Sequence, residues 1–243
     1  MSQNFVLLLL GCALLRISLF STTYVNYVKL GFRPLLIASG FVLLLLSVIG
    51  SVQAWRKSSQ ARGEDNHHPH DGHDHSHGPK VAWLMCLPVF AIFLIAPPAL
   101  GSFAASRSDE APPPPPTEVI DAFAPLTGRE PTEMTISEFI GRAWDDKKKT
   151  LAGHPVRLTG FVSPAKKKGT WYVTRMVLAC CAADAYALKV KVSNQPQPRE
   201  NSWVEVTGTW VPPKWSKLPN GVVFAELAAT DVQPVEEPSE PYE

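Results

Sequence analysis

The first part of the chain is dominated by apolar residues, and a mixed pattern follows. Residues 1–103 are mostly Leu, Val, Ile, Phe and Ala, whereas residues 104–243 have the charge density of a water-soluble domain. A helix needs about 20 apolar residues to cross a hydrocarbon core about 30 Å thick. The contrast predicts a membrane protein with an α-helical transmembrane region and a soluble C-terminal domain.

Three apolar segments are long enough to cross a bilayer, which predicts about three spans, at residues 5–28, 34–54 and 81–103. The second segment carries no charge. The first is interrupted by Arg16, which either snorkels to the interface or faces a partner inside a helix bundle. Pro88, Pro97 and Pro98 interrupt the third, so we expect a kink there or an early end near Ala96.

Charged residues near these segments predict the orientation of the chain. The N-terminus lacks a basic region before its apolar run and has no clear A-x-A cleavage site, so an anchor is favoured over a secretory signal. Four basic residues lie in loop 55–80 and three on the opposite side, namely Lys29, Arg33 and Arg107. The positive-inside rule therefore predicts a cytoplasmic loop and an extracytoplasmic C-terminal domain.

Loop 55–80 contains six of the seven histidines: His67, His68, His70, His73, His75 and His77. Neutral imidazoles interleaved with carboxylates suit zinc, nickel or copper. Because Pro69, Gly72 and Gly78 oppose a regular helix, the loop would wrap around an ion, and protons would compete with metal near the histidine pKa. The alternative is a low-complexity solvated loop with incidental metal affinity.

A Pro-rich linker is predicted over residues 104–131, with five consecutive prolines at 112–116. Such a stretch forms an extended spacer and would set the soluble domain off from the bilayer. A helix is expected next, because apolar residues recur at helical spacing from Ile136 to Trp144. Thr135 and Glu138 have the spacing of a capping box at its start.

The apolar period then changes to two, which predicts five strands, at residues 156–162, 171–178, 186–192, 203–211 and 222–227. Five short strands with one helix predict a small mainly-β domain over residues 132–232, an OB-like five-stranded barrel. Gly160 and Gly208 would permit the bends that closure requires. Residues 233–243 are expected to form a flexible tail.

The charge balance bears on the role of such a barrel. OB-like barrels often bind nucleic acid or sugars, but a fold does not fix a function. From Thr117 onward, Lys and Arg total 15 and Asp and Glu total 16. This balance predicts no nucleic-acid partner.

The most distinctive string of the soluble domain is Arg175-x4-Cys180-Cys181-x-Ala183-Asp184-Ala185. Two adjacent thiols and a nearby carboxylate can ligate a metal ion, with Cys180, Cys181 and Asp184 as ligands. The thiols can also cycle through a strained vicinal disulfide. In a third interpretation one cysteine packs in the core while Asp184 caps the turn through its own backbone.

On this string, together with the spans and the His-rich loop, the chain resembles a YcgQ-like family of bacterial permease subunits. The positions that carry the resemblance are Arg175, Cys180, Cys181, Ala183, Asp184 and Ala185. The resemblance covers nearly the whole chain in the order of its parts. It implies a multi-pass protein of the bacterial plasma membrane, a multi-span permease of the YcgR- or YraQ-like type as partner, and a link to metal supply.

These observations predict a non-enzymatic accessory subunit of a membrane permease complex for metal ions or metal complexes, with zinc or another divalent ion bound. Three spans without an internal repeat are few for a self-sufficient transporter. One alternative is a membrane-anchored thiol oxidoreductase, although a C-x-x-C motif is missing. Another is an extracytoplasmic binding protein. Because the chain has no H-E-x-x-H string, Walker motif or dinucleotide glycine motif, an enzyme is disfavoured.

Overall fold

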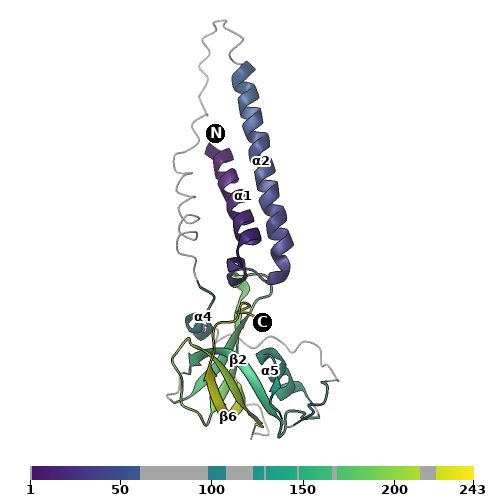
Figure 1. Ribbon diagram of the computed structural model, residues 1–243, viewed down its shortest axis with the longest axis vertical. Helices are drawn as coiled ribbons and strands as arrows, with labels where there is room; N and C mark the ends of the chain where they lie inside the picture. Colours follow the sequence, from purple (N-terminus) through teal and green to yellow (C-terminus); the bar gives the residue numbers. More distant parts are fainter. Residues whose placement is uncertain are drawn as a thin grey trace. The chain divides into compact units, whose positions relative to one another are not determined.

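The computed structural model describes residues 2–60, 98–107, 123–128, 130–146, 148–165, 169–213 and 223–243. The chain divides into two compact units, Met1–Pro98 and Ala99–Glu243 (Figure 1). The His-rich loop, the five prolines and most of the third predicted span lie outside the described residues.

Within its described residues, the first unit contains a pair of helices, α1 (Ser2–Phe20) and α2 (Arg33–Gln60), that pack side by side. The two backbones approach closely at Gly11, where an added Cβ would lie 3.0 Å from the Gly40 carbonyl oxygen. At one end of the pair, Arg33 Nε donates to the Ser18 carbonyl at 3.0 Å. At the other, Ser47 Oγ donates to the Asn4 carbonyl at 2.6 Å. The pair is therefore tied at its middle and at both ends.

Two stretches of this unit, Gln3–Phe20 and Leu30–Arg56, are long and apolar enough to cross a membrane by length and composition. The side chains that face away from the partner helix remain uncovered within the described residues; Leu35 is 64% exposed and Leu45 is 61% exposed. A continuous apolar surface of this kind is rare on a protein surrounded by water.

The first predicted span is shorter than expected, because α1 ends at Phe20 and not near residue 28. Ser21 Oγ accepts a hydrogen bond from the Thr23 amide at 3.0 Å, and such local bonds compete with the helix. Two 3₁₀ helices follow, η1 (Thr23–Asn26) and η2 (Leu30–Phe32). Arg16 is exposed about one turn before the end of α1.

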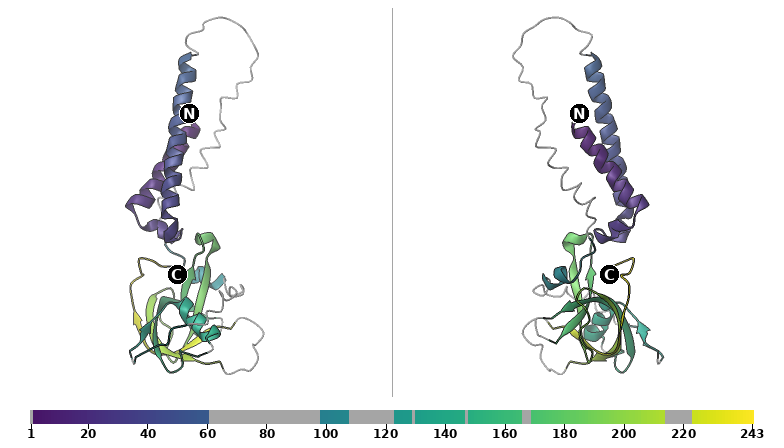
Figure 2. Two further views of the ribbon diagram at one scale, coloured as in Figure 1. Left: turned by 90° about the vertical axis from the view of Figure 1, so that its right-hand side faces the viewer. Right: turned by 60° about the vertical axis from the view of Figure 1, so that its left-hand side comes forward.

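The second unit is a closed barrel of five strands: β2 (Pro155–Pro164), β3 (Trp171–Val177), β4 (Tyr186–Ser193), β5 (Trp203–Val211) and β6 (Ala225–Pro234). Their order is β2-β3-β4-β6-β5, and β5 pairs with β2 to close the ring (Figure 2). Within the ring only β4 and β6 run parallel. A short strand, β1 (Thr132–Glu133), adds to β2. The predicted five-stranded barrel is confirmed, with the Greek-key connectivity of an OB-like barrel.

Helix α5 (Ile136–Asp145) covers the barrel core, and both Ile136 and Phe139 are fully buried. Thr135 caps it as expected, since Thr135 Oγ1 accepts from the Glu138 amide at 3.0 Å. The second half of the predicted capping box is absent, because the Glu138 carboxylate instead pairs with Arg142 at 2.8 Å.

The last strand and the tail differ from the sequence prediction. β6 begins at Ala225 and continues to Pro234, whereas residues 222–227 were predicted. Beyond the strand, residues 235–243 return to the barrel, and Tyr242 forms an isolated β-bridge with Met176. The carboxylate of Glu243 accepts from the amides of Ile136 and Ser137, each at 2.9 Å. These bonds satisfy helix-end donors that would otherwise be unpaired.

Helix α4 (Ser102–Arg107) occupies the residues where the third span was predicted to end and the linker to begin. It belongs to the barrel unit. Ala105 is fully buried and packs with Phe161 and Met176. The physical reason is that Ala104 and Ala105 are small enough for the helix backbone to lie close against β2 and β4.

The far end of the predicted linker also packs on the barrel. The guanidinium of Arg142 lies 4.9 Å above the ring of Phe123 and donates to the Ala124 carbonyl at 2.9 Å. Leu126 packs against the main core. Residues on both sides of segment 108–122 therefore lie on the barrel, and the segment itself is outside the described residues.

Candidate functional site

Cys180, Cys181 and Asp184 lie in the turn that joins β3 to β4, and η5 (Ala182–Asp184) forms part of it. The chain leaves the core at Leu178, which is 1% exposed. Cys180 is exposed and Cys181 is half-buried. The interpretation that placed one cysteine in the core is wrong, because Leu178 takes that position.

The carboxylate of Asp184 organises this turn. Its Oδ1 accepts from the Ala179 amide at 2.8 Å, and its Oδ2 accepts from the amides of Cys180 and Cys181 at 2.8 and 3.2 Å. The Cys181 side chain in return accepts from the Asp184 amide. Three N–H donors around one carboxylate form the charge-assisted bonds that are strongest in proteins. The turn is therefore folded around Asp184.

The geometry brings the two thiols and the carboxylate together. One ligand atom from each of Cys180, Cys181 and Asp184 lies within 4.8 Å of the others. Tetrahedral zinc with Zn–S bonds near 2.3 Å holds its sulfur ligands roughly 3.8 Å apart. A small closure of the side chains would therefore bring the three groups onto one ion, and the chemistry of the donor set fits zinc.

The charges of the site shift two pKa values in opposite directions. The hydrogen bond of its thiol to Asp184, and a second to Cys181, raise the pKa of Cys180 to about 12. The same thiol bond, together with three amide bonds, lowers the pKa of Asp184 to about 2. At neutral pH without metal, Cys180 is therefore a protonated thiol and Asp184 a carboxylate, and a protonated thiol is a poor nucleophile.

Among the residues that the structure describes, the set offers three protein ligands. Within the described part of the chain, no second group of three His, Cys, Asp or Glu side chains converges in this way. Structural zinc sites close with four protein ligands, whereas catalytic zinc sites use three and keep the fourth position open. The exposed set of three would therefore leave one position of a bound ion open.

Arg175, the first residue of the motif, is not part of the metal set. Its guanidinium lies 5.0 Å above the ring of Trp203, and its NH2 donates to the Glu240 carbonyl at 3.0 Å. Its Nε lies 3.9 Å from the Glu243 carboxylate. Burial lowers the pKa of Arg175, and the charges of Glu243 and Glu240 oppose that shift. Arg175 thus holds the end of the chain against β3, directly before the cysteine turn.

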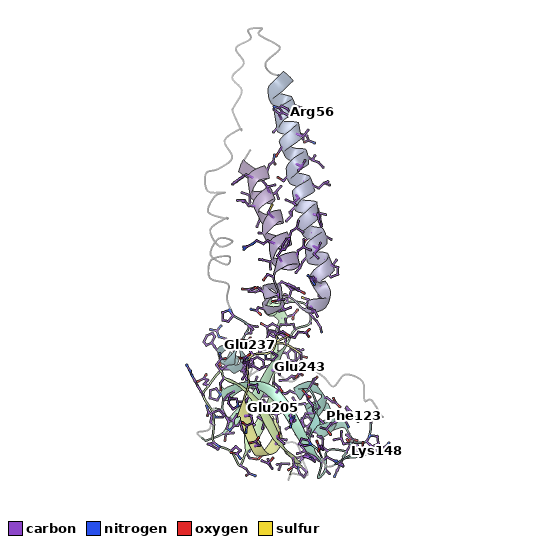
Figure 3. The ribbon with its side chains drawn as sticks, in the orientation of Figure 1. Arg56, Phe123, Lys148, Glu205, Glu237 and Glu243 are labelled. Atoms are coloured by element: carbon purple, nitrogen blue, oxygen red, sulfur yellow. The ribbon has the colours of Figure 1, made fainter. Side chains whose placement is uncertain are left out.

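Sequence reasoning missed the residues at the end of the chain. The residues concerned lie against the end of β3, just before the turn, and they are Glu240, Tyr242 and Glu243. The Glu243 amide, for example, donates to the Met176 carbonyl at 3.0 Å. Figure 3 labels Glu237 and Glu243 in the barrel unit. The sequence pattern of this segment does not predict its contact with β3. The six histidines of the predicted metal loop lie outside the described residues, so the structure does not join them to this site.

Fold and site together define a two-part protein, in which a pair of long apolar helices precedes a five-stranded barrel that carries a thiol–carboxylate cluster. Residues 5–108 match the DUF1980 N-terminal domain, and residues 140–243 match the DUF1980 C-terminal domain. The chain belongs to the DUF1980 family, in agreement with the predicted YcgQ-like resemblance. No curated protein matches it.

Proposed function

We propose that this protein is a non-enzymatic, membrane-anchored subunit of a permease complex that binds a thiophilic divalent metal ion such as zinc. The observation that carries the proposal is the convergence of Cys180, Cys181 and Asp184 in an exposed turn. Two thiolates and one carboxylate suit zinc, and the open position suits uptake and release of the ion.

Anchoring is supported by the first unit, which has two helices of sufficient length and apolarity and a large uncovered apolar surface. We propose a bacterial plasma membrane protein whose barrel lies on the extracytoplasmic side, as the basic residues of loop 55–80 favour. Three apolar segments without an internal repeat are few for a self-sufficient transporter. A multi-span permease of the YcgR- or YraQ-like type would supply the pathway for the ion.

The alternative of a thiol oxidoreductase is less well supported. Catalytic thiols have a lowered pKa, because the thiolate is the attacking species. The pKa of Cys180 is shifted in the opposite direction, and the cause is the carboxylate beside it. The same carboxylate favours a cation, which would replace the thiol proton.

Uptake of radioactive zinc by cells tests the role in transport. We expect cells that lack this chain to regain uptake with the natural chain and to remain at the deletion level with Cys180→Ser/Cys181→Ser. The matched control is Cys12→Ser, which removes an exposed cysteine of α1 and should restore uptake fully. Full restoration by the double variant, at equal protein level, would contradict the proposal.

A further inference from the structure

The barrel is attached to the apolar part of the chain through α4, and this attachment is short. Segment 81–98 contains no Asp, Glu, Lys or Arg, and α4 begins at Ser102. The five Cα–Cα steps from Pro98 to Phe103 span roughly 18 Å when fully extended. If segment 81–98 ends at the membrane surface, α4 must lie close to that surface.

Helix α4 is fixed on the barrel by buried packing and three hydrogen bonds. The Ser102 amide donates to Asn201 Oδ1 at 2.9 Å, and the Leu100 amide donates to the Tyr242 hydroxyl at 2.9 Å. Lys189 Nζ, itself buried, donates to the Ala105 carbonyl at 2.8 Å. Because α4 is fixed to the barrel by these contacts, the position of α4 sets the orientation of the barrel.

The outer face of α4 has the chemistry of a lipid interface. Phe103 is 73% exposed, although it is the largest apolar side chain of the helix. The guanidinium of Arg107 lies 4.9 Å above its ring. An aromatic ring with a basic group beside it suits the level of the phospholipid headgroups, where the ring enters the acyl boundary and the cation meets phosphate.

The cysteine turn lies at the same end of the barrel as α4. Leu100 and Ala104 pack in one cluster with Met176 at the end of β3 and with Ala185, the residue after Asp184. Tyr242 links the two, since its hydroxyl accepts from Leu100 while its backbone bridges to Met176.

We infer that the end of the barrel formed by α4 and the cysteine turn rests on the phospholipid surface, with Phe103 and Arg107 among the headgroups, so that the Cys180–Cys181–Asp184 site opens at the membrane and not toward bulk solution. This inference rests on the proposed membrane anchoring. It places the open coordination position where a membrane-embedded partner can supply the completing ligand and receive the ion.

Fluorescence quenching by lipids tests this placement in the full chain, reconstituted in phosphatidylcholine–phosphatidylglycerol vesicles. Single cysteines at Phe103→Cys, Ala183→Cys and Lys148→Cys, each in a background with the four natural cysteines changed to Ser, carry a bimane label. Lys148 is exposed and lies away from α4 in Figure 3. Leu45→Cys in α2 is the positive control, and circular dichroism of each variant verifies the fold.

With nitroxide headgroup lipids, we expect quenching at positions 103 and 183 to exceed that at 148 at least threefold. If lipid quenchers reach the label at position 45 but headgroup nitroxides do not quench the label at position 103, the inference is overturned and the membrane anchoring stands. Quenching at 103 with position 183 equal to 148 would overturn the placement of the site. If neither acyl-chain nor headgroup nitroxide lipids quench the label at position 45, the membrane anchoring itself is overturned.

Discussion

Replacing Asp184 with Asn should accelerate the alkylation of Cys180 at least tenfold at pH 8. An ordinary cysteine thiol has a pKa near 8.5, so a substantial fraction is thiolate at that pH. Beside the Asp184 carboxylate the pKa is about 12, and the thiolate is correspondingly scarce. Removal of the negative charge lowers the pKa of Cys180 toward its ordinary value. We expect the alkylation rate to rise less than the full pKa shift implies, because both groups are exposed and water screens their interaction.

The measurement is the rate of iodoacetamide reaction with Cys180 as the single cysteine, followed from pH 6 to 10. With Asp184 present, the rate should still rise at pH 10. With Asp184→Asn, it should level off near the ordinary thiol pKa. The matched control is Asp231→Asn, an exposed carboxylate on β6, which should leave the rate unchanged. Equal rates with and without the Asp184 carboxylate would mean that it does not control this thiol.

Replacing Gly160 with Ala should lower the stability of the barrel by about 2–4 kcal/mol. An added Cβ would lie 2.5 Å from the Thr174 carbonyl oxygen and 3.0 Å from a methyl carbon of Val173. The first of these is backbone, so the strand β3 itself must move, and β3 leads directly into the cysteine turn. At Gly208 an added Cβ would likewise lie 2.4 Å from the Ala228 carbonyl oxygen, where the pairing of β5 with β6 shifts register.

Thermal unfolding of residues 99–243, followed by circular dichroism, measures this effect. We expect Tm to fall by roughly 5–15 °C, as that loss of stability implies for a domain of this size. Thr159→Ala is the control, because it changes the neighbouring residue on the same strand, whose side chain is half-buried. A Tm for Gly160→Ala equal to that of the control would show that closure does not depend on this glycine.

The barrel was largely predictable because its strands follow local rules. Val156, Leu158 and Val162 are buried as their period of two requires, and the glycines lie where the strands approach closely. The end of β6 was not predictable, since Ala228 and Ala229 have little strand preference. That end is held by its pairing with β5, in which Val204 to Thr209 supply the partners of Ala228 to Pro234.

Tertiary contacts explain the other differences. The prolines before α4 predict an end of the apolar segment, but the contacts of α4, such as the packing of Ala105 on Phe161, are what show that it belongs to the barrel. Likewise, the predicted tail contains no hydrophobic pattern, yet Glu243 caps α5 across more than 100 residues of sequence. Local periodicity carries no information about such contacts.

The candidate site was predictable in its members but not in its architecture. The sequence singled out Cys180, Cys181 and Asp184, but left open whether a cysteine lies in the core. That question depended on Leu178, whose side chain takes the core position. The role of Asp184 as the centre of the turn rests on three amide bonds that no spacing rule specifies.

Zinc content of the purified full chain after equilibrium dialysis tests the metal site most directly. All variants carry the six loop histidines replaced by Asn, so that the loop adds no zinc, and Cys12→Ser serves as the control. We predict about one zinc per chain at neutral pH with Cys180 and Cys181 present, and none with Cys180→Ser/Cys181→Ser at an unchanged circular dichroism spectrum. Equal zinc in both, or none in either, would contradict a metal site at Cys180, Cys181 and Asp184.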